Sequence, residues 1–138
     1  MISVVIPSSV TSIRYGAFEG CTSLTSVVIP DSVEVISKHA FENNAETLKS
    51  VKIGKGTKII EDYAFYGCVV AKTITISNIC EEIGEAAFYN CKAVEELIIP
   101  DSVKSIGDYA FRSCVEVTEL RFSGNIETLG ASAFYDCN

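Results

Sequence analysis

Apolar and polar positions recur along the chain with a period of about 23 residues. An Ala-Phe dipeptide marks each repeat, with phenylalanines at Phe18, Phe41, Phe65, Phe88, Phe111 and Phe134. An aliphatic residue lies five positions before each of them, at Ile13, Ile36, Ile60, Ile83, Ile106 and Leu129. A unit of this size cannot bury its own apolar face. The period therefore predicts a solenoid in which equivalent residues of successive repeats stack into one core.

The first half of each repeat is typical of a short β-strand. In Leu24–Ile29, Val27 and Ile29 fall on one face and the segment is rich in β-branched residues. We expect successive strands to pair in parallel, about 4.8 Å apart, as one six-stranded sheet. Pro7, Pro30 and Pro100 are expected to end three of the strands.

The second half of each repeat changes period. Ile106, Ala110, Phe111 and Cys114 are spaced i, i+4, i+5 and i+8, which indicates one face of a short helix or helical turn. Two positions after each phenylalanine stand Gly20, Asn43, Gly67, Asn90, Ser113 and Asp136. Glycine and asparagine tolerate positive φ, so this column is expected to end the helical turn. The predicted fold is an α/β solenoid, a right-handed β/α superhelix with a parallel sheet on its inner face and short helices outside.

Composition narrows the classes of function. The formal charge of −7 argues against binding to nucleic acid, and apolar runs of only a few residues argue against membrane insertion. In five of the six repeats a cysteine stands three residues after the phenylalanine, and in the second repeat Asn44 takes that place. The sixth cysteine, Cys80, lies in a column of mostly valines. Buried thiols are the favoured interpretation, and disulfides between neighbouring coils are the alternative. The sequence has no paired Cys-x-x-C spacing of the kind that binds zinc. It also has no glycine-rich phosphate loop, so we expect neither a metal nor a cofactor.

Catalysis has little support in the sequence. His39 is the single histidine, and no nucleophile and base can be paired around it, so we expect it to pack at the surface. The adjacent carboxylates of Glu61-Asp62, Glu81-Glu82 and Glu95-Glu96 are expected to be solvated. Tyr66, Tyr89 and Tyr135 follow phenylalanines, and packing between the turns is favoured over binding for this row. The chain is predicted not to be an enzyme.

The repeat reads roughly I-P-x-S-V-x-x-I-x-x-x-A-F-x-x-C, best seen in residues 29–44 and 99–114. It resembles the leucine-rich repeats of the BspA-like, or Treponema pallidum, type over essentially the whole chain. The resemblance implies a leucine-rich-repeat domain with repeats at 1–23, 24–47, 48–70, 71–93, 94–116 and 117–138. It also implies a cell-surface or secreted protein that adheres to host proteins, matrix or other microbes. Family members typically carry more repeats, so we expect a fragment of a longer chain, or self-association through uncapped ends.

Strand alternation predicts two columns of outward side chains, and a third, flanking column contains Lys49, Lys72 and Glu95. The candidate partner-binding face consists of Ser26, Val28, Lys49, Ser50, Lys52, Lys72, Thr73, Thr75, Glu95, Glu96, Ile98, Glu119 and Arg121. It runs from apolar through basic to acidic and lacks aromatic anchors, which is typical of a weak, avidity-dependent binder or of a plain solvent face. The functional hypothesis is a non-catalytic protein-interaction module of an adhesin-like protein, whose partner is a host surface or matrix protein. The alternative is a structural spacer or self-associating scaffold without a specific ligand.

Overall fold

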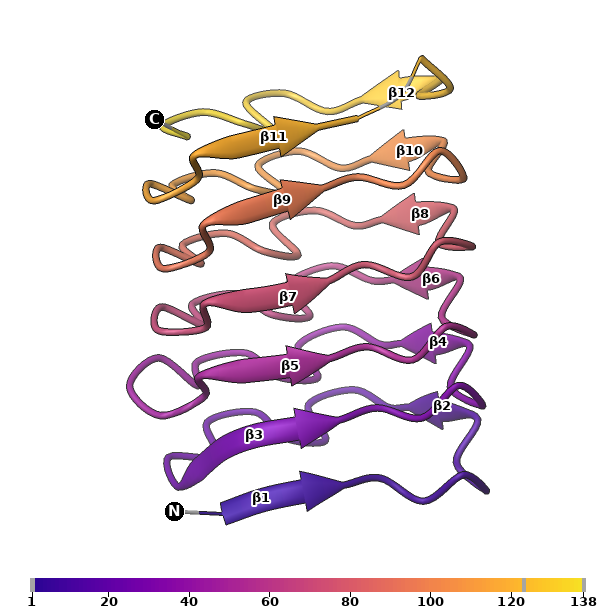
Figure 1. Ribbon diagram of the computed structural model, residues 1–138, viewed down its shortest axis with the longest axis vertical. Helices are drawn as coiled ribbons and strands as arrows, with labels where there is room; N and C mark the ends of the chain where they lie inside the picture. The colour runs from indigo at the N-terminus through magenta and orange to yellow at the C-terminus, as the bar shows by residue number, and fades with distance from the viewer. Residues whose placement is uncertain (1, 123, 138) are drawn as a thin grey trace.

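The computed structural model describes residues 2–122 and 124–137, which form a right-handed coil of parallel strands (Figure 1). The outer limits of the first and last predicted repeats, residues 1 and 138, lie outside the described residues. The longer strands form one side of the coil: β1 (Ile2–Val5), β3 (Leu24–Val28), β5 (Ser50–Lys52), β7 (Thr73–Thr75), β9 (Glu96–Ile98) and β11 (Glu119–Arg121). Two-residue strands form the opposite side: β2 (Ser12–Ile13), β4 (Val35–Ile36), β6 (Ile59–Ile60), β8 (Glu82–Ile83), β10 (Ser105–Ile106) and β12 (Thr128–Leu129).

The phenylalanines stack in one row through the core. Consecutive rings from Phe18 to Phe134 have centroids 5.0–5.3 Å apart and planes within 5° of parallel. The isoleucines of the short strands pair in the same register, Ile13 with Ile36 and Ile36 with Ile60. The predicted stacking of equivalent residues is therefore confirmed. The strands before Pro7, Pro30 and Pro100 each end two residues before the proline, also as predicted.

The predicted outer helices are wrong. Over residues 2–122 and 124–137 the second half of each repeat forms tight turns and a short strand, with no helix. The N–H groups of Phe41 and Asn43 donate to the next coil, to the carbonyls of Ala64 (2.7 Å) and Tyr66 (2.9 Å). The N–H group of Ala40, by contrast, donates to Ser37 within its own coil (3.2 Å). A helix would direct all of these donors along its own axis, so the cross-coil bonds favour successive turns. For the same described residues, no helix is long and apolar enough to cross a membrane.

Two columns of left-handed residues create these turns. The predicted column, from Gly20 to Asp136, has φ between 58° and 72°, although it ends a turn and not a helix. A second column was not predicted: Gly16, His39, Tyr63, Ala86, Tyr109 and Ser132 have φ between 50° and 60°. This conformation costs a non-glycine residue about 1–2 kcal/mol. It directs the N–H of His39 to the carbonyl of Asp62 (3.2 Å), so the backbone bond between coils offsets the strain.

The long strands do not form the single six-stranded sheet that the sequence predicts. They divide into a four-stranded sheet, in the order β1-β3-β5-β7, and a β9-β11 pair, whereas the two-residue strands form the six-stranded sheet. Among the described residues, no ladder hydrogen bonds join β7 to β9. A small apolar cavity of about 10 Å³ lies below this break, lined by residues that include Ile74, Val94 and Leu97. The core column that contains Leu24 and Leu48 has the smaller Ala71 and Val94 in the coils on either side of the break, so the core is less completely filled here.

Candidate protein-binding face

The candidate face lies on the solvent side of the long strands. Val27, Val51, Ile74 and Leu97 point into the core, so the residues that alternate with them point outward. Eleven of the predicted residues are exposed: Val28, Lys49, Ser50, Lys52, Lys72, Thr73, Thr75, Glu95, Glu96, Ile98 and Arg121. Ser26 and Glu119 are half-buried. The coil thus brings the whole predicted set onto one face, which crosses the break between β7 and β9.

Some basic side chains on this face form ion pairs with carboxylates, and others do not. Lys72 forms an ion pair with Glu95 across the break (3.5 Å), and Arg121 pairs with Glu119 along β11. Lys49 and Lys52, at β5, have no ion-pair partner within residues 2–122 and 124–137. Lys55 is also exposed and lacks such a partner in this part of the chain. Unneutralised positive charge therefore gathers on β5 and the turn that follows it.

Sequence reasoning missed Lys55 because it treated Gly54–Thr57 only as a repeat turn. The backbone explains its position: the N–H of Lys55 donates to the carboxylate of Asp31 at 2.7 Å. A Cβ on Gly54 would lie 2.3 Å from the carbonyl oxygen of Pro30, so only glycine lets this turn approach the preceding coil. The available signal was a lysine between two glycines directly after a strand that already carries Lys49 and Lys52.

Two hollows interrupt the face. The larger, which we call the strand-end groove, has a volume of about 730 Å³ and lies where β3, β5 and β7 end. Its lining includes Val28, Ile53 and Ile76, with Lys52 and Lys55 among its polar residues. A second hollow of about 260 Å³ lies over the break, between the residues of β7 and β9. Both hollows reach Ile76, which belongs to the core, so the face offers apolar contact as well as charge.

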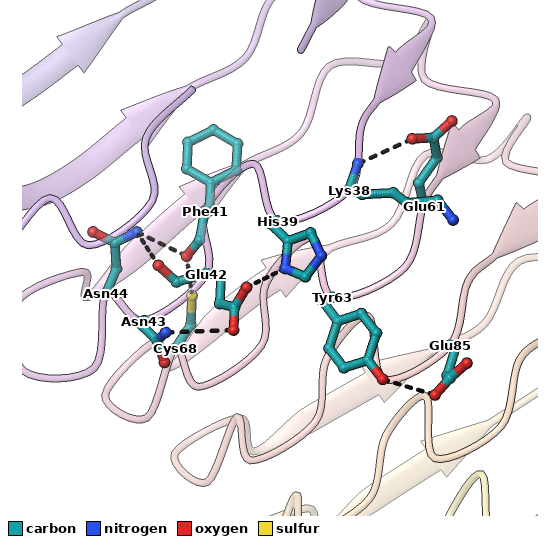
Figure 2. Close-up of polar contacts among 10 residues, drawn as sticks. All are labelled: Lys38, His39, Phe41, Glu42, Asn43, Asn44, Glu61, Tyr63, Cys68 and Glu85. Atoms are coloured by element: carbon teal, nitrogen blue, oxygen red, sulfur yellow. Dashed lines mark hydrogen bonds and ion pairs between the residues drawn. The ribbon is translucent and has the colours of Figure 1, made fainter. Parts of the chain in front are cut away.

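The turns on another side of the coil carry a polar cluster that serves packing (Figure 2). The His39 ring contacts the Glu42 carboxylate and stacks on Tyr63, with centroids 5.1 Å apart and planes 2° from parallel. The Tyr63 hydroxyl donates to Glu85 at 2.7 Å, and this bond, aided by partial desolvation, raises the pKa of Tyr63 to about 12. His39 therefore packs between coils, as predicted.

An ion pair joins the same turns. Lys38 Nζ lies 2.7 Å from Asp62 Oδ2, and the Glu85 amide donates to Asp62 Oδ1 at 2.9 Å. Partial burial tends to raise the pKa of Asp62, but these two hydrogen bonds outweigh it and hold the pKa below its ordinary value. Asp62 was expected to be solvated, and the structure shows that its carboxylate bridges neighbouring coils instead. In the predicted tyrosine row, Tyr66 and Tyr89 stack at 5.1 Å, whereas Tyr135 is 60% exposed and contacts the guanidinium of Arg112 at 4.8 Å.

The cysteine column is structural. Cys68, Cys91 and Cys114 donate to the carbonyls of the preceding coil's phenylalanines at 3.3–3.4 Å. Burial raises the pKa of Cys68 and of Cys80 to about 12, so both remain thiols at neutral pH. Burial is confirmed for Cys68, Cys80, Cys91 and Cys114, whereas Cys21 and Cys137 are half-buried.

Asn44 takes the place of cysteine in the second coil. Its Nδ2 donates to the carbonyls of Phe18 (2.8 Å) and Phe41 (2.7 Å). The Phe18 carbonyl is the group that a cysteine at this position would reach, judging from the other coils. Asn44 Oδ1 is buried and has no hydrogen-bond partner among the described residues. Asparagine thus satisfies the donor role of the column and leaves one acceptor unpaired.

Parallel coils, a phenylalanine row and backbone bonds between turns define this protein as a leucine-rich-repeat solenoid. The family described as "BspA type Leucine rich repeat region" matches residues 1–47 and 43–138 in six copies, and the chain belongs to this family. The sequence resemblance is thereby confirmed. Among curated proteins, none matches this sequence.

Solved structures with the same fold come from three bacteria. A leucine-rich repeat protein from Bacteroides ovatus is 34% identical with a TM-score of 0.91, over 99% of this chain and 37% of that one. The T. pallidum leucine-rich repeat protein is 27% identical with a TM-score of 0.80, over 99% and 76%. A leucine-rich cell surface protein from Faecalibacterium prausnitzii is 24% identical with a TM-score of 0.77, over 98% and 45%. The chain therefore spans well under half the length of the Bacteroides ovatus protein.

Proposed function

We propose that this chain is a non-catalytic protein-interaction module that binds its partner through the candidate face. The observation that carries this proposal is the continuity of the face: exposed charge and two apolar-walled hollows lie on one side of a regularly stacked coil. Leucine-rich repeat proteins usually mediate protein interactions, and solenoids use extended surfaces of this kind. The candidate face has no aromatic anchors, which favours a modest affinity for each copy of the chain. The overall affinity would rise where several copies bind the partner together.

The proposal extends to the cell surface or the extracellular space, with a host surface or matrix protein as partner. Its support is the family and the likeness to a solved protein that is described as a leucine-rich cell surface protein. The acidic character of the chain, with a formal charge of −7, favours a protein over nucleic acid.

The experiment that tests this function reverses the basic band. A Lys49→Glu, Lys52→Glu, Lys72→Glu variant and the wild type are immobilised as multivalent arrays and exposed to purified matrix proteins and host surface proteins. We expect the variant to lose capture about tenfold at an unchanged melting temperature, since these side chains are exposed. The matched control is Arg14→Glu, Lys58→Glu, Lys104→Glu, which changes the net charge equally away from the face and spares the Lys38–Asp62 pair between coils. Equal capture by all three proteins would refute the proposal and favour the spacer.

Self-association is a second candidate function, favoured by apolar side chains at both ends of the coil. Ile2 is 54% exposed in the first turn, and Phe122 and Leu129 are 50% and 55% exposed in the last. End-to-end stacking of two copies would cover both sets. Sedimentation equilibrium of the wild type against an Ile2→Glu, Leu129→Glu variant tests this. A wild type that stays monomeric at high concentration would exclude end-to-end association of this chain.

A further inference from the structure

We infer that the segment bound by the face is an extended acidic peptide, which places carboxylates over Lys49, Lys52 and Lys55 and an apolar side chain in the strand-end groove. This inference rests on the proposed function and adds the chemistry of the partner. It depends on three observations: the location of unpaired positive charge, the spacing of the lysines along the chain, and the apolar wall beside them.

The charge argument starts from the contrast between this patch of three lysines and the lysines that form ion pairs; the single Lys92, before β9, is also exposed and has no ion-pair partner among the described residues. Lys38 pairs with Asp62 (2.7 Å), Lys58 with Glu34 (3.1 Å) and Lys104 with Glu81 (3.5 Å). Within the described residues, the three lysines on and after β5 have no such partner. The chain as a whole is acidic, with a net charge of −7, and therefore repels an acidic partner. The three lysines form a local positive patch, which favours the approach of such a partner at this place. Electrostatic complementarity of this kind sets orientation and association rate.

The spacing of the lysines favours an extended ligand. Lys49 and Lys52 flank and end β5, and Lys55 lies in the turn that follows, beside Lys52 in the lining of the strand-end groove. At about 3.3 Å per residue, the stretch from the first to the last lysine spans at most ~20 Å. An extended peptide of about six residues covers that length, with acidic side chains at intervals of two or three residues. A compact anion would reach only one or two of the ammonium groups.

The apolar wall distinguishes a peptide from other polyanions. Val28, Ile53 and Ile76 line the strand-end groove next to Lys52 and Lys55, in a volume of about 730 Å³. That volume falls in the range of sites that take small ligands or large apolar side chains. The carboxylate of Asp31 also lines the groove and accepts the Lys55 N–H, and its charge offsets part of the positive charge of Lys52 and Lys55 there. A sulfated polysaccharide would satisfy the lysines but has no apolar side chain for the wall.

Fluorescence anisotropy at low salt tests the inference with a fluorescein-labelled peptide of about seven residues, in which glutamates flank a central leucine. We expect Lys49→Gln, Lys52→Gln, Lys55→Gln to weaken binding about tenfold or more. The matched control, Lys38→Gln, Lys58→Gln, Lys104→Gln, removes the same charge elsewhere and is expected to change binding less than about twofold. Replacing the peptide's leucine by serine is expected to weaken binding to the wild type, and Val28→Asn in the protein is expected to abolish that difference.

Several outcomes would overturn the inference. They are no binding of the acidic peptide, equal weakening by both lysine sets, indifference to the leucine, or tighter binding of a heparin fragment than of the peptide. Its failure is distinguishable from failure of the proposed function. If Lys49→Glu, Lys52→Glu, Lys72→Glu still abolishes capture of a protein while the acidic peptide does not bind, only the partner chemistry is wrong.

Discussion

Replacing Phe88 by alanine removes one ring from the middle of the phenylalanine row. Phe88 is 2% exposed, and its ring centroid lies 5.2 Å from that of Phe65 and 5.1 Å from that of Phe111. Truncation of a buried phenylalanine costs about 3–5 kcal/mol, because apolar transfer free energy is lost and a cavity remains. Phe88 already borders the small cavity under the β7–β9 break, so its truncation would enlarge an existing void. We therefore expect the loss to lie in the upper half of that range.

Two further variants separate burial from ring stacking. Phe88→Leu keeps most of the apolar volume and loses two ring contacts, which are worth about 0.5–1.5 kcal/mol each. Phe18→Ala is the matched control, since Phe18 is half-buried and has a single ring neighbour, Phe41, at 5.0 Å. Its loss is expected to be about 1–2 kcal/mol, in proportion to its smaller burial.

Urea unfolding followed by far-ultraviolet circular dichroism measures these losses, provided that the dependence of the free energy on urea is the same in each variant. A loss below about 1 kcal/mol for Phe88→Ala would show that Phe88 is not a stacked core residue. Equal losses for Phe88→Ala and Phe18→Ala would show that position in the row does not matter. Either result would refute the continuous core on which the architecture depends.

Three other predictions concern single features. Asn44→Cys is expected to melt no lower than the wild type, because it restores the column's thiol donor and removes the unpaired Oδ1, whereas Asn44→Ala should cost about 1–2 kcal/mol; a melting temperature of the cysteine variant below that of the wild type would contradict this. The Asp62 pKa is lower in the folded chain than its ordinary value of 3.8, so its stabilisation is present above that pH and is lost as pH falls through the folded pKa. Asp62→Asn should therefore flatten the acid limb of unfolding free energy against pH, and an unchanged acid limb would count against the Lys38 pair. Amide hydrogen exchange should be faster in β7 and β9 than in β3 and β5, because the ladder between β7 and β9 is missing; uniform protection across these strands would show that the sheet is closed.

The helix prediction failed because a spacing of i, i+4, i+5 and i+8 is compatible with two structures. A helical turn and a pair of tight turns both place Ile106, Ala110, Phe111 and Cys114 toward the core. The choice depends on where the backbone N–H groups find acceptors, and here alternate donors reach the next coil. The left-handed column that contains His39 and Tyr63 escaped notice for the same reason. Tyrosine and alanine, which occupy this column at Tyr63 and Ala86, do not favour positive φ, and bonds between coils impose it.

The candidate face shows a similar division. Alternation along the strands was sufficient to predict which residues point outward, since a strand with one buried face has a period of two. The β7–β9 break, the strand-end groove and the position of Lys55 depend on how well adjacent coils fill the space between them. That filling follows from differences such as Leu48 against Val94, whose consequences appear only when the coils are stacked.

The sequence by itself determined the period, the core columns, the class of repeat and the outward set, because apolar side chains that recur at one interval are buried only by stacking. The tertiary structure decided the turns, the division of the sheet and the grooves, because these depend on hydrogen bonds and packing between residues about 23 positions apart. A local sequence pattern cannot predict such a bond, because its donor and acceptor lie in different repeats.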